Sequence, residues 1–414
     1  AIARIANPEL EGDTQALIDK YIDKDDAIFF LGRLVWQGEM SRCAASFISI
    51  AADVGRNIHV RRVSARTVFT CGTQQQQQKL WQQLNCGAEY IQRELLAEIV
   101  DEADITVDDV EQLMISLNKL PPYERFKGTG LSRSLHSYID RLSESENQPE
   151  LVRLIEGMYG FLEREPFIER GECYVSKEYA WLLNSATHAV ESLVKNRHTF
   201  ALEYPALAIL MKVPTLRFWT GGEFSEYKGD LHSLVPSWPE LNDALFWSSI
   251  ELARKIQLNR NGEALIDTNS MSWLEHYWDF DKESFSRLLE YVTSRDEHDD
   301  RLVALSAAHG VYIESDKPDA MLKQLKTAVE HDPDLHGRLS ALLNPPVTEA
   351  MRKSQAEQAT RQQAHALEEK RQAQARESWV KALRDDPDRL SNSSDLAQGN
   401  ILNDQYLLCL LYTS

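Results

Sequence analysis

The residues of this chain best suited to chemistry form two clusters in which a histidine lies beside carboxylates. The first is Glu297-His298-Asp299-Asp300 and the second is Glu330-His331-Asp332. Imidazole and carboxylate groups can bind a metal ion or act as acid and base. Neighbouring residues of a helix point in different directions, so neither cluster brings its groups onto one ion without help from elsewhere. The sequence therefore predicts no metal site and no catalytic residue.

The sequence carries no signature of nucleotide or hydrolase chemistry. Gly128-Thr129-Gly130 is a single glycine pair without a preceding strand or the spacing of a phosphate-binding loop, and no GxxxxGK[ST], HExxH or GxSxG pattern occurs. We therefore expect a non-enzymatic chain without a cofactor. The alternative is an all-helical hydrolase with carboxylates in a central cleft, for which Glu223 and Glu226 are the candidate acid and base.

Two groups of aromatic residues are candidates for binding a partner. One lies in the irregular segment 216–240, which glycines and prolines interrupt, and the other lies within residues 273–280. Long irregular segments are frequently functional, and aromatic anchors dominate protein interfaces. Packing in the core, or in an insertion that covers an edge, is the alternative for both groups. The expected partner-binding residues are Trp219, Phe224, Tyr227, Trp273, Tyr277 and Trp278.

The charge and cysteine content narrow the classes of partner and compartment. The 414 residues include 45 basic and 64 acidic side chains, which give a formal charge of −19. This charge is a poor match to nucleic acid or to an anionic membrane, so we expect a protein partner, no membrane and no nucleic acid. The five cysteines are scattered without a CxxC spacing and predict neither a disulfide framework nor a zinc ribbon. A reducing cytoplasm fits this pattern.

The elements that must position these residues read as helices throughout. Apolar residues at helical spacing, interrupted by glycine, proline, asparagine and serine, predict helices and no sheet. Thr106 and Asp109 form a variant of the capping box, and Val311–Ile313 reads as a short extended piece. The predicted helices cover 27–36, 40–51, 60–71, 74–84, 90–100, 107–120, 132–142, 151–164, 177–193, 206–211, 238–258, 284–293, 301–309 and 351–384.

Two helical hairpins near the start of the chain repeat at a 34-residue step. At this step Leu31, Leu34, Val35, Gly38, Phe47 and Ile50 fall on Ala65, Val68, Phe69, Gly72, Trp81 and Leu84. A fixed step is the sequence signature of stacked helix pairs, which bury their apolar faces against neighbouring pairs.

Residues 57–65, Asn-Ile-His-Val-Arg-Arg-Val-Ser-Ala, resemble the opening of a HEAT-type repeat. The resemblance covers about residues 25–86 and implies an α-solenoid. A three-helix bundle would show the same periodicity and stays the alternative. Asp332-Pro333 and Asp386-Pro387 resemble the end of a tetratricopeptide unit, although Asp-Pro is also a general helix terminator.

The predicted fold class is all-α, an α-solenoid of antiparallel helical hairpins (HEAT- and tetratricopeptide-like) followed by a long polar helix. HEAT-like repeats are expected over 1–215, an aromatic, Gly- and Pro-rich insertion over 216–240, and further hairpins over 241–346. A long charged helix is expected over 347–390. Its part from Met351 to Arg384 has eight basic and four acidic residues, which is typical of a solvated helix.

Both ends of the chain indicate a fragment of a longer protein. The sequence starts at Ala1 without a signal-peptide pattern. Residues 391–414 are expected to be an incomplete tail. Its last part, Cys409–Ser414, resembles a translated sequencing adapter, which implies that the natural protein continues past about Tyr406.

Residues 377–397, which include Glu377-Ser378-Trp379, resemble an element of the helical regions of large bacterial NTPases of the NACHT or STAND type. The resemblance implies a helical array that senses a ligand, while a separate nucleotide-binding module drives oligomerisation, often in antiviral defence. We therefore expect a non-catalytic interaction or ligand-sensing scaffold, with any ATPase module outside this chain. A general assembly scaffold is the second alternative. Oligomerisation of the full-length protein stays open.

Overall fold

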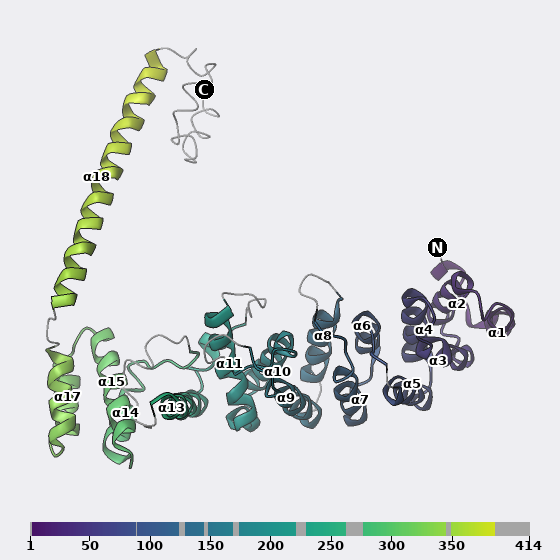
Figure 1. The fold of residues 1–414 in the computed structure, drawn as a ribbon, viewed down its shortest axis with the longest axis horizontal. Helices are drawn as coiled ribbons and strands as arrows, with labels where there is room; N and C mark the ends of the chain where they lie inside the picture. Colours follow the sequence, from purple (N-terminus) through teal and green to yellow (C-terminus); the bar gives the residue numbers. More distant parts are fainter. Residues whose placement is uncertain are drawn as a thin grey trace. The chain divides into compact units, whose positions relative to one another are not determined.

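In a computed structural model, the chain is all-α wherever its structure is described (Figure 1). The described residues are 2–87, 89–123, 129–144, 148–168, 174–220, 229–261, 276–344 and 349–385. Within these ranges the nearest approach to a sheet is one isolated bridge between Phe167 and Ser176. The predicted fold class, all-α, is therefore confirmed. The chain divides into two compact units, Ala1–Leu339 and Ser340–Ser414.

The α-helices follow one another with short connections, several of which contain single turns of 3-10 helix. In the first unit they are α1 Glu11–Lys20, α2 Asp25–Gln37, α3 Ala44–Ala52, α4 Ile58–Cys71, α5 Gln74–Cys86, α6 Arg93–Glu102, α7 Val107–Leu117, α8 Leu131–Glu144, α9 Gln148–Leu162, α10 Leu183–Lys195, α11 Tyr204–Thr220, α12 Leu231–Leu234, α13 Pro239–Asn261, α14 Phe285–Ser294, α15 His298–Glu314 and α16 Asp319–Ala328. Helix α17, Pro333–Leu343, runs across the boundary between the units.

Helix α18, Glu349–Asp385, lies in the second unit and matches the predicted long polar helix closely. The side chains described along it, from 361 to 385, are exposed, as expected for a helix without an apolar face.

Side-chain caps and close contacts set where the helices begin and end. Thr73 and Gln76 form a reciprocal capping box at the start of α5. Gly72, just before it, ends α4 where a Cβ atom would lie 2.4 Å from the carbonyl oxygen of Val68. The predicted cap of α7 is confirmed, since Thr106 Oγ1 accepts a hydrogen bond from the backbone N–H of Asp109 at 3.1 Å.

From α2 to α11 the helices pack in two rows, in which each helix contacts the next-but-one helix of the chain. Helices α2, α4, α6, α8 and α10 pack in succession, and so do α3, α5, α7, α9 and α11. Contacts between consecutive helices, such as α3 with α4 and α10 with α11, join the rows. One core cluster extends over these helices from Ile18 to Tyr277.

The residues related by the 34-residue step occupy corresponding places in the two hairpins. The apolar members of both sets are buried, with exposed fractions of at most 7%. Gly38 and Gly72 end the corresponding helices α2 and α4. The repeat seen in the sequence is therefore a repeat of buried positions.

Several boundaries differ from the sequence prediction, and α1, α12, α16 and α17 lie outside the predicted helix ranges. The expected extended piece Val311–Ile313 is wrong, because α15 continues through these residues to Glu314. Val311 and Tyr312 are buried in its apolar face, so tertiary packing overrides their preference for extended structure. Helix α11 extends to Thr220, past the expected boundary at residue 215.

Candidate functional site

The structure describes the side chains of two of the six aromatic candidates. Tyr277 is buried in the core cluster. Trp278 is half-buried, stacks on His276 at a ring-centroid distance of 3.4 Å and meets the edge of Phe246 at 5.0 Å. Trp219 belongs to α11, but its side chain lies outside the described residues, as do Phe224, Tyr227 and Trp273. Packing accounts for the contacts of both described candidates.

The two histidine–carboxylate clusters make structural contacts. Arg254 of α13 forms ion pairs with Asp299 at 3.0 Å and with Asp300 at 2.6 Å. Asp332 accepts hydrogen bonds from the first backbone N–H groups of α17 and pairs with Arg301 at 3.1 Å. Glu223 and Glu226 lie outside the described residues. Over the described ranges, no three His, Cys, Asp or Glu side chains are grouped so that they could hold a metal ion.

The described structure contains a groove over α2, α4 and α6, here called the arginine groove. It consists of two adjoining cavities of about 330 and 310 Å³ that share His59 and Arg62. The remaining lining residues are Phe29, Arg33, Trp36, Val63, Arg66 and Glu98 in the first cavity, and Ile58, Gln92, Arg93, Glu94, Pro121, Pro122, Tyr123 and Thr129 in the second.

Helical spacing places the first cavity's residues on facing stripes. Phe29, Arg33 and Trp36 follow one face of α2 at i, i+4 and i+7. His59 and Arg62 lie on the face of α4 that lines the same cavity. The Arg33 guanidinium lies 5.9 Å from the Phe29 ring centroid, and the Arg66 guanidinium lies 5.2 Å from that of Trp36. These distances suit cation–π contacts, so the aromatic rings orient the arginines along the groove.

An acidic stripe on α6 holds two of these arginines in place. Arg62 donates from Nε and Nη2 to Oε2 of Glu98 at 3.1 and 2.8 Å. Arg66 pairs with Glu98 at 2.7 Å and with Glu102 at 3.3 Å. Glu98 is only 8% exposed, so this network fixes the spacing between α4 and α6 at the bottom of the groove.

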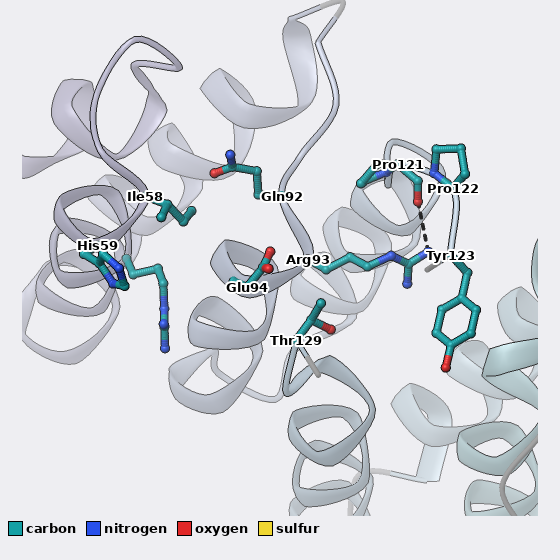
Figure 2. Close-up of a pocket in the computed structure, with 10 residues that line it drawn as sticks. Ile58, His59, Gln92, Arg93, Glu94, Pro121, Pro122, Tyr123 and Thr129 are labelled. Atoms are coloured by element: carbon teal, nitrogen blue, oxygen red, sulfur yellow. Dashed lines mark hydrogen bonds between the residues drawn. The ribbon is translucent and has the colours of Figure 1, made fainter. Parts of the chain in front are cut away.

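Arg93 lies in the second cavity between α4 and the residues that follow α7 (Figure 2). Its Nη2 donates to the carbonyl oxygen of Pro121 at 3.0 Å. The guanidinium is 5.4 Å from the Tyr123 ring centroid and 4.4 Å from that of Trp181. Burial lowers the pKa of Arg93 from its ordinary value, because desolvation disfavours the charged form.

Several N–H donors of the groove have no acceptor among the described residues. Trp36 Nε1 and Arg93 Nε are buried without a hydrogen-bond partner there, and so is Trp181 Nε1 beside Arg93. Arg33 is exposed, and its one described contact is the Phe29 ring. A buried donor without an acceptor costs about 1–3 kcal/mol, so a ligand atom that reached one of the buried donors would be stabilising.

This groove is not among the sites predicted from the sequence. Arg61 and Arg62 were named only within the residues that resemble a repeat, and the net charge of −19 gives no sign of a basic surface. One signal was available, because His59, Arg62 and Arg66 recur at i, i+3 and i+7 in a chain whose overall charge is negative. The contribution of Arg93 could not be read in this way, since it lies 27 residues after Arg66.

Among the helices that the structure describes, none combines the length and the apolar character that a membrane crossing requires. No family model, curated protein or solved structure matches this chain.

Proposed function

We propose that this chain is a non-catalytic helical scaffold that binds a protein partner through the arginine groove. The observation that carries the proposal is the composition of the groove, in which arginines of α2, α4 and α6 line the same cavities as Phe29 and Trp36 of α2 and Tyr123 after α7. Arginine and aromatic side chains contribute most of the binding energy in protein interfaces. Because rings and carboxylates already hold the arginines in place, a partner would order few additional side chains on binding.

The same proposal includes a solenoid arrangement of the first unit. Contacts between next-but-one helices support it, since in stacked arrays each repeat contacts only its neighbours and the exposed helix faces line up into one binding surface. The groove crosses α2, α4 and α6, which are successive members of one row.

We further propose that the chain is the sensing part of a bacterial STAND-type NTPase that acts in the cytoplasm in antiviral defence. Only the resemblance of residues 377–397 supports this assignment. It predicts that a longer reading frame encodes a phosphate-binding loop and that the present chain does not hydrolyse ATP. Measurable ATP turnover by the purified chain would contradict the proposal.

The described structure bears differently on the two alternative functions, a hydrolase and a general assembly scaffold. The hydrolase alternative depends on Glu223 and Glu226, which lie outside the described residues, so no described contact favours it. A general assembly scaffold would use the same groove, and the identity of the bound protein distinguishes it from a defence sensor.

Photo-crosslinking in cells tests the binding surface. A benzophenone amino acid in place of Arg33 is expected to capture a discrete protein, because this exposed position lines the groove. The same amino acid in place of Lys323, an exposed residue of α16, is the matched control. Capture of the same proteins at both positions, or of none at position 33, would contradict the proposal.

A further inference from the structure

We propose that the partner of the arginine groove is an acidic protein segment, whose carboxylates bind the groove's unused N–H donors. This inference rests on the proposed function, since it assigns a chemistry to the partner that the groove binds. It goes further because it predicts which peptides bind and which do not.

The first argument is the hydrogen-bond inventory of the groove. Trp36 Nε1 and Arg93 Nε are buried donors without an acceptor in the described structure, and Arg93 is only 7% exposed. In contrast, two acceptors of the lining are occupied, since Gln92 Oε1 accepts from Arg61 and the Pro121 carbonyl oxygen accepts from Arg93. A ligand that supplies acceptors completes this inventory, whereas one that supplies donors does not.

The second argument is the local charge. Four arginines and two glutamates line the two cavities, within a chain whose formal charge is −19. Glu98 already neutralises part of the positive charge of Arg62 and Arg66. Arg33 lines the first cavity and Arg93 the second, and neither forms an ion pair with a described carboxylate, although Glu94 and Glu178 lie near Arg93. A segment with separated carboxylates would therefore find a guanidinium in each cavity.

The third argument favours a peptide over a nucleic acid. The lining of the groove also contains the apolar side chains of Phe29, Trp36, Val63 and Ile58 and the acidic side chain of Glu98. A phosphate backbone carries charge at every step and would meet Glu98, while a peptide can place an apolar side chain there and its carboxylates on either side.

Fluorescence anisotropy with the full chain tests the inference. The probes are fluorescein-labelled short peptides in which leucine and phenylalanine are flanked by glutamates, by glutamines or by lysines, and a labelled single-stranded oligonucleotide of similar length. The glutamate peptide is expected to bind more tightly than the other probes, and its binding is expected to weaken as salt is added.

Three variants locate the binding site. Arg33→Glu reverses an exposed charge and is expected to weaken binding of the glutamate peptide about tenfold or more, while Trp36→Phe keeps the ring, removes the Nε1 donor and weakens it less. Arg371→Glu makes the same charge change on the basic helix α18 and is expected to leave binding unchanged. Circular dichroism confirms that each variant is folded.

The contradicting outcomes are specific. Equal binding of the three peptides, tighter binding of the oligonucleotide, an unaffected Arg33→Glu variant or a loss of binding in Arg371→Glu would each overturn the inference. If crosslinking at position 33 captures a protein while the glutamate peptide does not bind, the acidic chemistry is wrong and the proposed function stands. If position 33 captures nothing, the proposed function itself is wrong.

Discussion

At the scale of single residues, the close approach of α2 and α4 depends on Gly32. A Cβ atom there would lie 2.6 Å from Val63 Cγ1 and 3.2 Å from Phe47 Cε1. The Thr67 hydroxyl donates to the Gly32 carbonyl oxygen at 3.1 Å across the same contact. This contact sets the distance between the two stripes that form the first cavity of the arginine groove.

Gly32→Ala is therefore expected to destabilise the fold. Gly310→Ala in α15 is the matched control, because a Cβ atom at Gly310 has open space. Both substitutions raise the helix propensity by a similar amount. The Gly32→Ala variant should therefore be less stable than the Gly310→Ala variant by the cost of overpacking at position 32, about 1–3 kcal/mol. Urea unfolding followed by circular dichroism measures the difference, and equal stabilities would show that α2 and α4 do not pack this closely.

A second prediction concerns the pair His136 and His188, whose ring centroids are 4.9 Å apart. Burial, and then the neighbouring His188, lowers the pKa of His136 below 6.5, while Asp140 opposes the shift. As the pH falls, the unfolded chain therefore binds a proton at His136 at a higher pH than the native chain does. The free energy of unfolding is thus largest above the pKa of His136 in the unfolded chain and decreases below it.

We expect the stability of the wild-type chain to fall more steeply than that of His136→Gln between about pH 8 and about pH 5. Hydrogen exchange of α8 and α10 across this range gives the local stability of each protein. Parallel pH profiles, or a steeper loss in the variant, would contradict the assignment.

Residue-level features were predictable where a local rule governs them. Thr106 was expected to cap a helix, because a cap acts within a few residues. The arginine groove depends instead on contacts between helices, such as Arg62 with Glu98, which are 36 residues apart. Sequence spacing alone does not give that register.

At the scale of the helix, α5 shows how a capping box initiates a helix whose first turn is polar. Its first turn consists of glutamines, so the start depends on Thr73 rather than on apolar packing. Thr73 Oγ1 accepts from the backbone N–H of Gln76 at 3.4 Å, and the Gln76 side chain accepts from the backbone N–H of Thr73 at 2.8 Å.

Thr73→Ala removes half of this box and is expected to cost about 0.5–2 kcal/mol. Gln75→Ala, at an exposed position of the same turn, removes no hydrogen bond to a described residue and is expected to be neutral or slightly stabilising. Thermal unfolding of both variants tests the role of the cap. A Thr73→Ala protein as stable as Gln75→Ala would refute it.

Helices were predictable as elements because their periodicity is local, and their ends were less so. The extended reading of Val311–Ile313 failed because three β-branched or aromatic residues in a row suggest a strand, while burial of Val311 and Tyr312 keeps them in α15. The aromatic candidates were read in the same local way, and Tyr277 lies in the core because of partners distant in sequence.

At the scale of the whole molecule, we expect the helices of the first unit to be stabilised by their neighbours in the two rows. Trp81 is a suitable probe, since it is 1% exposed, meets the edge of Phe69 at 5.4 Å and donates to Asp109 Oδ1 at 3.0 Å. It therefore connects α5 with α4 and α7. Trp81→Ala should cost about 3–5 kcal/mol at this point of the array.

Hydrogen exchange of the full-chain Trp81→Ala variant, read helix by helix, tests the central claim most directly. In an array the loss of protection is expected to be largest in α4, α5 and α7, smaller in the next helices of each row, and absent in α14 and α15. A uniform loss of protection from α1 to α16 would show one cooperative core instead of an array, and would contradict the account.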